Sequence, residues 1–369
     1  GWTFKGSGSI DPRGYPLLYL GQGVQNTSAE GTYGAWFRVV SLIENKVLWS
    51  FGGADPASPR RWQAYDSSAL FNAEADTLVV GGENGLLYTV KLNTAFDKVN
   101  GTVSVQPEKL VKYRYAANGY GESDSARWYG IESSVAAWKH YAFFTDNGGL
   151  LQCVNLRTMT PVYAVDVTDD GDAGVVLEED GAAGTIYLYT ACKVDKQPGV
   201  AEGYGKCYHR KINGLTGETV WEASLPASAA GNGGTLSTPH AGRGNISDLV
   251  IYNASLSPVT VNGSAVDGGV LIAYDKATGS EVWRYEQEAG YWSTPVGLYD
   301  ENGNATIAQC DRAGMLRLHD GRTGEVLAEV NLGSRVEATP SVFHNMLVVG
   351  TRGLDGSGES ARIIGVRIG

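Results

Sequence analysis

Apolar and polar residues alternate along this chain in short runs, and turns rich in Asp, Asn, Thr and Gly separate the runs. The clearest example, residues 271–283, has an alternating strand, an Asp-Lys-Ala-Thr-Gly turn and a second strand that ends in Val-Trp. This pattern predicts a β-hairpin, because the turn glycine supplies the positive φ angle that a tight connection needs. Related phrases occupy residues 209–221 and 316–327, so the hairpin is a repeat.

A second pattern precedes each hairpin and extends the repeat. Ser-Thr-Pro or Ala-Thr-Pro tripeptides at 237–239, 293–295 and 338–340 each open a short apolar stretch. Another apolar run follows the stretch, as in residues 347–350. The repeating unit therefore contains four short strands, and four-stranded units that recur at roughly 40 to 50 residues are typical of β-propeller blades.

The number of repeats predicts the number of blades. Third strands fall at seven places along the 369 residues, which gives about 53 residues per blade. They lie near Leu42, Val90, Asn155, Ile212, Tyr274, Leu318 and Val366. We therefore predict one all-β domain over residues 1–369, a seven-bladed β-propeller with four-stranded antiparallel blades. Eight blades remain the alternative, with an eroded blade within Ala95–Arg127.

The last repeat predicts how the ring closes. Residues 362–368 supply a third strand, and no fourth strand follows them. The first residues of the chain, Gly-Trp-Thr-Phe-Lys, are typical of a fourth strand. We expect Gly1–Lys5 to join the last blade, because closure removes a sheet edge that would otherwise invite aggregation.

The phrase over residues 271–283 resembles the repeat of the pyrroloquinoline-quinone (PQQ) dehydrogenases. It also resembles the repeat of their non-catalytic relatives, which include the outer-membrane assembly lipoprotein of Gram-negative bacteria. For the dehydrogenases, the resemblance implies adjacent cysteines and a calcium site of Glu, Asn and Asp that hold PQQ on a longer, eight-bladed chain. This chain has no adjacent cysteines, so we expect a PQQ-like propeller without PQQ; its motifs support neither PQQ nor calcium as a cofactor, and both stay open as alternatives.

Other metal-binding patterns are weak. Residues 240–251 and 300–307 resemble eroded FG-GAP loops of the integrin type. The second lacks the full series of oxygen ligands of a calcium loop, and an Asn-Gly hairpin turn explains it better. The four cysteines have no Cys-x-x-Cys spacing, which sets zinc aside. Cys192 and Cys207 are predicted to lie across one hairpin, either as a disulfide or as buried thiols, and both interpretations stay open.

The formal charge of −11 argues against nucleic acid and against an anionic membrane surface as partners. No apolar run approaches the roughly 20 residues that span a bilayer. The chain starts part-way through a predicted strand, at Gly1, and reads as a mature or trimmed piece. We therefore expect a monomer outside the cytoplasm, secreted or held at the cell surface through a segment that precedes Gly1.

Catalytic motifs are missing from the sequence. It contains no Gly-x-Ser-x-Gly elbow, no phosphate-binding Gly-x-x-x-x-Gly-Lys-Ser/Thr and no His-Glu-x-x-His. The five histidines fall on predicted strands or strand ends, and no carboxylate or nucleophile accompanies them at a readable spacing. We expect these histidines to be structural.

One constellation emerges when the repeats are aligned on their Ser-Thr-Pro positions. The residues just before the tripeptide or its equivalent are Asp66, Glu132, Asp172, Leu236, Trp292 and Glu337, of which four are acidic. First strands line the central channel of a propeller, so these positions form a ring. With the neighbouring aromatic and basic residues, the ring predicts a site for a cation or for a cationic or sugar-like ligand. The candidate residues are Asp66, Trp128, Glu132, Asp172, Tyr291, Trp292, Arg335 and Glu337. The alternative is structural, since such carboxylates also accept backbone N–H bonds or face a water-filled funnel.

Two functions follow from these observations. The first is a non-enzymatic propeller that binds a protein, peptide or glycan partner on its top face, as a scaffold. The alternative is an enzyme, either a PQQ-dependent oxidoreductase or another enzyme that uses the acidic ring. The missing cofactor motifs favour the first, although a fold shared by enzymes and scaffolds does not by itself name a function.

Overall fold

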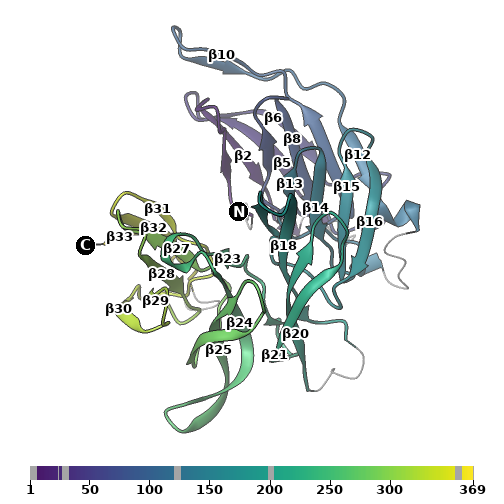
Figure 1. Cartoon of the computed structure of the whole chain (residues 1–369). Helices are drawn as coiled ribbons and strands as arrows, with labels where there is room; N and C mark the ends of the chain where they lie inside the picture. The colour runs from purple at the N-terminus through teal and green to yellow at the C-terminus, as the bar shows by residue number, and fades with distance from the viewer. Residues whose placement is uncertain are drawn as a thin grey trace. The chain divides into compact units, whose positions relative to one another are not determined.

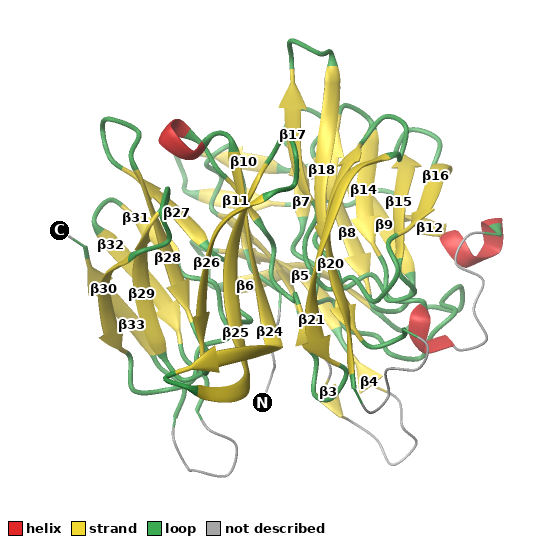
Figure 2. Ribbon diagram, turned by 60° about the horizontal axis from the view of Figure 1, so that its bottom comes forward, coloured by secondary structure: helices red, strands yellow, loops and turns green. Residues whose placement is uncertain are grey.

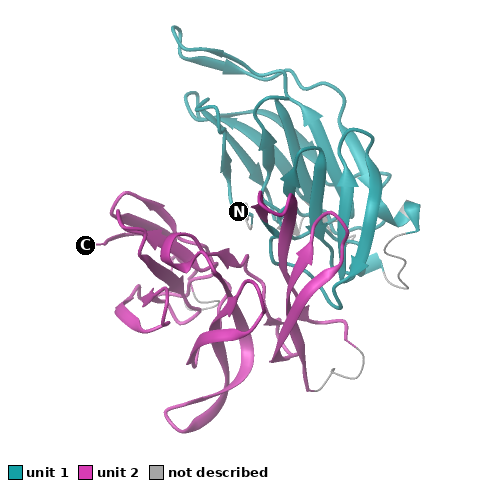
Figure 3. Ribbon diagram, in the orientation of Figure 1, with its two compact units in different colours: residues 1–177 teal, residues 178–369 magenta. Residues whose placement is uncertain are grey.

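The computed structural model describes residues 6–23, 25–26, 33–119, 126–197, 203–353 and 360–368. Regular structure over these residues is almost entirely β-strand, as the alternating pattern predicts (Figures 1 and 2). The short 3-10 helices are Tyr115–Asn118 (η1), Ala126–Trp128 (η2) and Gly244–Ile246 (η3). In this described part of the chain, no helix has the length and apolarity needed to cross a membrane. The chain divides into two compact units, residues 1–177 and 178–369 (Figure 3).

Three four-stranded antiparallel sheets, blades 1 to 3, come first along the chain. Blade 1 consists of β1 (Ser9–Ile10), β2 (Leu17–Gly21), β5 (Trp36–Ser41) and β6 (Lys46–Gly52). Blade 2 consists of β7 (Leu70–Asn72), β8 (Thr77–Gly82), β9 (Leu86–Lys91) and β12 (Val111–Arg114). Blade 3 consists of β13 (Ala136–Trp138), β14 (Tyr141–Thr145), β15 (Leu150–Asn155) and β16 (Thr160–Asp166). Two small hairpins lie outside these sheets, β3 (Gln25–Asn26) with β4 (Tyr33–Gly34) and β10 (Ala95–Asp97) with β11 (Thr102–Ser104).

Blades 4 to 7 follow. Blade 4 consists of β17 (Val176–Asp180), β18 (Thr185–Ala191), β20 (Tyr204–Asn213) and β21 (Thr219–Ser228). Blade 5 consists of β19 (Lys193–Val194), β22 (Gly233–Gly234), β23 (His240–Ala241), β24 (Leu249–Val261), β25 (Ser264–Asp275) and β26 (Glu281–Gln287). Blade 6 consists of β27 (Val296–Tyr299), β28 (Ala305–Cys310), β29 (Met315–Asp320) and β30 (Val326–Asn331). Blade 7 shows β31 (Ser341–Phe343), β32 (Met346–Gly350) and β33 (Ile363–Arg367).

These sheets confirm the predicted seven-bladed β-propeller, and each predicted third strand lies in or next to the third strand of a blade. The alternative of an eighth blade within Ala95–Arg127 is wrong. That segment forms the β10–β11 hairpin, the short helix η1 and β12, the outer strand of blade 2. The predicted fourth strand of blade 7, Gly1–Lys5, lies outside the described residues.

The Trp that ends the sequence phrase in one blade contacts the turn Gly of the phrase in the next blade. In blade 5, the Asp275 carboxylate accepts hydrogen bonds from the backbone N–H and the hydroxyl of Thr278, both at 2.8 Å, which closes the turn. Gly279 completes the turn at φ +73°, and a Cβ there would lie 2.7 Å from the ring of Trp221 in blade 4. The Trp221 indole also donates to the carbonyl of Lys276 at 2.9 Å. Trp221 of blade 4 therefore fixes the turn of blade 5.

The strand register of blade 4 does not place Cys192 opposite Cys207. Cys192 instead faces Tyr208, whose carbonyl accepts its backbone N–H at 3.2 Å. Successive residues of a strand point to opposite faces, so the two thiols do not face each other across the ladder. The Cys207 thiol lies 3.2 Å from the hydroxyl of Thr235 and 3.5 Å from Nε2 of His209.

Candidate functional site

A recurring backbone hydrogen bond places the candidate residues at equivalent positions. The carbonyl at the end of the second strand of a blade accepts the N–H of the residue just before the candidate in the next blade, at 3.0 to 3.2 Å. The bonds are Tyr65 to Gln22, Ile131 to Gly82, Gly171 to Asp146 and Thr235 to Cys192. The residues that follow these donors are Asp66, Glu132, Asp172 and Leu236, as the alignment on the Ser-Thr-Pro positions predicts.

A second recurring bond adds residues that the sequence alignment missed. In the turn between the second and third strands, one backbone N–H donates to the carbonyl two residues before the candidate of the same blade, at 2.7 to 3.0 Å. The N–H groups that donate are those of Glu83, Asn147, Arg312 and Arg352. The candidates two residues after their acceptors are, in the same order, Asp66, Glu132, Trp292 and Glu337. In blades 2, 3, 6 and 7 this bond places a residue of the turn beside the segment of the candidate residue.

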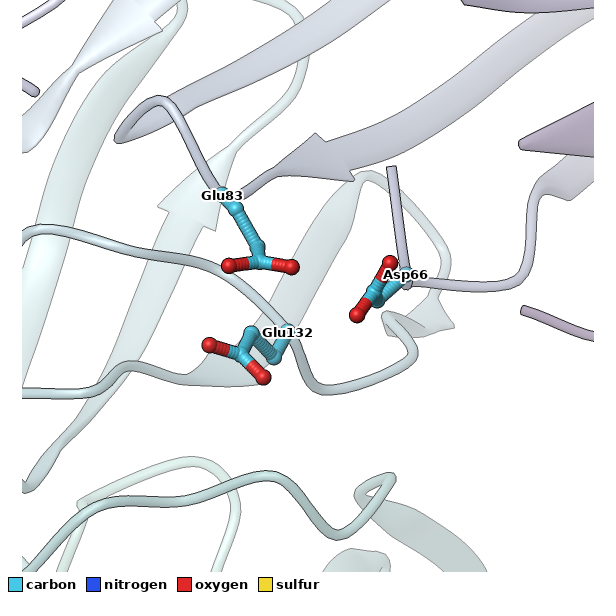
Figure 4. Close-up of side chains that lie close together, drawn as sticks. All are labelled: Asp66, Glu83 and Glu132. Atoms are coloured by element: carbon cyan, nitrogen blue, oxygen red, sulfur yellow. The ribbon is translucent and has the colours of Figure 1, made fainter. Parts of the chain in front are cut away.

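In blades 2 and 3 these positions form a carboxylate cluster of Asp66, Glu83 and Glu132 (Figure 4). One oxygen from each of the three side chains lies within 4.8 Å of the others. Glu83 is 1% exposed, and the other two are partly buried. Oxygen ligands of this type suit calcium or magnesium.

Two neighbours moderate the charge of the carboxylate cluster. Asn147 donates from Nδ2 to Oε1 of Glu132 at 2.6 Å. Arg60 lies with Nη2 3.6 Å from Oε2 of Glu83, and its side chain is only 14% exposed. The cluster thus combines the donor set of a cation site with one guanidinium that already compensates part of its charge.

The other candidates of the first unit lie near this end of blade 3 without joining the cluster. Asp172 holds the position in blade 4 that is equivalent to Glu132. The group of three close carboxylates found among the described residues does not include Asp172. Trp128 lies in η2 with the guanidinium of Arg127 4.2 Å from its ring centre. Its carbonyl lies 3.2 Å from a Cβ built on Gly148, in the turn of blade 3.

The equivalent positions of blades 6 and 7 form an arginine cluster, Trp292, Arg312, Arg335, Glu337 and Arg352. The Glu337 carboxylate lies 2.8 Å from Nε of Arg335, 3.5 Å from Nη2 of Arg312 and 3.0 Å from Nη1 of Arg352. The guanidinium of Arg312 lies 4.0 Å from the ring centre of Trp292, a cation–π contact. Here the single carboxylate is already surrounded by positive charge.

Tyr291 is a core residue. Its side chain is 1% exposed and packs in the cluster that contains Leu271 and Trp283. Burial raises the pKa of the phenol well above its ordinary value. A ligand therefore meets Trp292 rather than Tyr291 at this blade end.

Two buried histidines, His209 and His319, and the partly buried His240 have structural partners. His209 stacks on Tyr252 with ring centres 4.2 Å apart, and burial lowers the pKa of His209 to about 3. His240 lies 2.8 Å from the hydroxyl of Tyr299, and burial lowers its pKa to about 4. His319 lies 3.0 Å from the carbonyl of Gly324, and burial lowers its pKa as well. Each is neutral near pH 7, as a packed structural residue is.

The turn at Asp300 is closed by its own side chain. The backbone N–H of Asn304 donates to Asp300 Oδ1 at 2.8 Å, and Nδ2 of Asn304 donates to Oδ2 at 2.8 Å. Gly303 takes φ +79° in the same turn, between β27 and β28. This arrangement agrees with a hairpin turn.

A surface cavity of about 380 Å³ lies between blades 4 and 5. Lys276 donates to Oε1 of Glu178 at 2.5 Å and to the carbonyl of Gly242 at 3.0 Å. Lys211 donates to the carbonyl of Lys276 at 2.9 Å, and burial lowers the pKa of Lys211. Its lining holds the carboxylates of Glu178, Glu179, Asp180, Asp248 and Asp275 and the two amines of Lys211 and Lys276, so acidic groups outnumber basic ones.

Comparison with known proteins supports the PQQ-like repeat. Residues 266–363 match the family model of the outer membrane protein assembly factor BamB. No curated protein sequence matches the chain. The solved structure of BamB from Moraxella catarrhalis is similar at 15% identity and a TM-score of 0.57, covering 94% of this chain and 80% of that one.

Two further structures share the fold alone. The computationally designed Ika8 protein is 12% identical with a TM-score of 0.53, and the match covers 95% of this chain and 81% of that chain. Raptor from Chaetomium thermophilum is 11% identical with a TM-score of 0.54, over 94% of this chain and 27% of that chain.

The sheets define a seven-bladed β-propeller, and residues 266–363 of it match a PQQ-like family model. Within that class, the chain resembles the outer-membrane assembly factor BamB.

Proposed function

We propose that this protein is a non-catalytic binding propeller that works outside the cytoplasm, without PQQ, as a scaffold for a protein, peptide or glycan partner. The observation that carries the proposal is the likeness to BamB, an assembly factor, over 94% of the chain, together with the match of residues 266–363 to its family. In the proposal, the partner docks on the loops that join second to third strands.

The charged loop ends support a binding role. Repeated backbone hydrogen bonds hold the loops that carry these side chains, so a partner would meet a preformed framework. The carboxylate cluster of the first unit and the arginine cluster of the second carry opposite charge, so each can select a partner group of the opposite sign. His209, His240 and His319 are neutral and engaged in packing, which makes them poor acids or bases near pH 7.

One observation favours the alternative, an enzyme. The carboxylate cluster with Asn147 has the oxygen donors that a calcium ion takes, and a PQQ-dependent oxidoreductase uses such an ion. Against this, Arg60 lies beside Glu83 and would be repelled by a divalent cation. The binding function therefore stands as the proposal.

Photo-crosslinking in the native cell tests the proposed function. A photoreactive residue at Ala313, exposed in the turn of blade 6, is compared with one at Leu327, exposed on the outer strand β30. We expect a discrete adduct from position 313 and none from position 327. Adducts of equal yield at both positions, or none at either, would contradict docking at this end of the blades.

A further inference from the structure

We infer that Trp292, Arg312 and Arg335 form a recognition site for carboxylate groups of an acidic peptide segment. The inference rests on the proposed function and gives the partner a chemistry. It also reverses the sign of the ligand expected at this end of the blades, where the sequence predicts a cation.

The arginine cluster carries more positive than negative charge. Arg312 and Arg335 approach the same oxygen of Glu337, at 3.5 Å and 2.8 Å. Arg352 contacts the other oxygen at 3.0 Å. One carboxylate therefore serves two partly buried guanidiniums besides Arg352, and the arrangement retains a capacity for a second carboxylate.

The neighbouring acid does not neutralise the arginine cluster. Asp311 directs Oδ2 to Nη1 of Arg317 at 2.7 Å. Its Oδ1 accepts the backbone N–H groups of Ala313 and Met315, each at 2.9 Å. Asp311 is 1% exposed and committed to its own turn, so it leaves the charge of Arg312 available.

Among the described residues, two donors in the arginine cluster, on Trp292 and Arg312, have no acceptor, whereas Nε of Arg335 makes no hydrogen bond but lies 2.8 Å from an oxygen of Glu337. Within the described part of the chain, Nε1 of Trp292 and Nε of Arg312 are buried and make no hydrogen bond. A buried N–H without a partner costs free energy, and the usual partner is an oxygen of a ligand or of water. Both donors belong to side chains stacked at 4.0 Å, so they lie in one small region. Donors and charge together select an anionic acceptor.

A peptide carboxylate fits this region better than a membrane phosphate. Glu337 shows that a side-chain carboxylate can lie within ion-pair distance of the guanidiniums of Arg312 and Arg335. A planar carboxylate also matches the fork of a guanidinium and packs beside an aromatic ring.

A comparison of equivalent loop positions shows that the arginine and aromatic side chains are particular to blades 6 and 7. Where blades 2 and 3 carry Asp66, Glu83, Glu132 and Asn147, blades 6 and 7 carry Trp292, Arg312, Glu337 and Arg352. The same backbone framework therefore presents an acidic set in one unit and a basic, aromatic set in the other. Such loop variation on a constant frame is how propellers acquire binding specificity.

Fluorescence anisotropy of labelled hexaglutamate, with the full chain, tests the inference. We expect the wild-type protein to bind hexaglutamate but not hexalysine at this site. The double variant Arg312→Gln/Arg335→Gln should bind hexaglutamate at least about tenfold more weakly. The control, Arg284→Gln/Arg322→Gln, removes the same charge from exposed arginines outside the cluster and should leave the affinity unchanged.

Glu337→Gln provides a gain of affinity that a folding defect does not produce. Removal of the competing carboxylate should tighten hexaglutamate binding several-fold, because Arg312 and Arg335 are then free for the peptide. Equal weakening in both double variants, no tightening in Glu337→Gln, or displacement by inorganic phosphate as effective as by unlabelled hexaglutamate would overturn the inference. Persistence of the Ala313 adduct in Arg312→Gln/Arg335→Gln overturns the inference alone. If the otherwise unchanged chain gives no adduct from position 313 but still binds hexaglutamate, the proposed function is overturned and the inference is not.

Discussion

The indole of Trp283 in blade 5 packs directly on Gly324, in the turn of blade 6. A Cβ built on Gly324 would lie 2.5 Å from the ring, and the indole N–H donates to the carbonyl of Gly321 at 3.1 Å. Gly324 also takes φ +75°, where a side chain adds backbone strain. The contact joins successive blades and repeats the relationship of Trp221 with Gly279.

Gly324→Ala should therefore lower the free energy of unfolding by about 2 to 4 kcal/mol, the sum of backbone strain and overpacking. The control is Gly333→Ala, which has φ +73° but no atom within 4 Å of the added Cβ, and should cost only about 1 kcal/mol. Urea unfolding measures both. Equal losses would show that the contact with Trp283 contributes nothing.

The blades were predictable because their signals are local and repeated. The alternation, the Asp-x-x-Thr-Gly turn and the closing Trp lie within about a dozen residues, and they encode a hairpin and its contact with the next blade. The eighth blade was a wrong alternative, since the segment around Ala95–Arg127 supplies an outer strand that its weak pattern did not reveal.

The candidate site was predictable only in part. The position before the Ser-Thr-Pro tripeptide is local, and the backbone bonds bear out its equivalence in successive blades. Glu83, Asn147 and Arg312 were missed because they share no residue type. An alignment on their turn glycines, Gly85, Gly149 and Gly314, would have found them, since all three take positive φ. The surroundings of Glu337 depend on loops far apart in sequence.

The carboxylate cluster should bind a divalent cation weakly. We expect calorimetric titration with calcium to give heat that disappears in Glu132→Gln, because that variant removes one of three close carboxylates. Glu337→Gln, with the same change of charge, should keep the heat, since arginines surround Glu337. A loss in both variants, or no heat in the wild type, would contradict a cation site at Glu132.

Stability should fall as the pH is lowered from 7 to 5. Burial lowers the pKa of His209 to about 3, below the ordinary value of about 6.5, so the unfolded chain binds the proton first. Its contribution is present above pH 6.5 and is lost as the pH falls towards 3, by about 2 kcal/mol at pH 5. His209→Gln should lose correspondingly less between pH 7 and 5 in urea unfolding. An unchanged pH dependence in the variant would contradict the buried, neutral state.

Cys153 and Cys310 should resist alkylation in the folded protein. Burial raises the pKa of each thiol to about 12, so almost no thiolate forms at pH 8. Iodoacetamide labelling followed by mass spectrometry should modify them only after denaturation. Rapid labelling of either residue in the native chain would contradict the burial.

The central claim is that this propeller binds a partner and does not catalyse quinone chemistry. Difference absorbance after addition of PQQ and calcium to the full chain tests it most directly. The account predicts a spectrum equal to that of the free components and no reduction of an electron-acceptor dye with alcohol or sugar substrates. A perturbed quinone band that saturates at one equivalent, with dye reduction lost in Glu132→Gln, would contradict it.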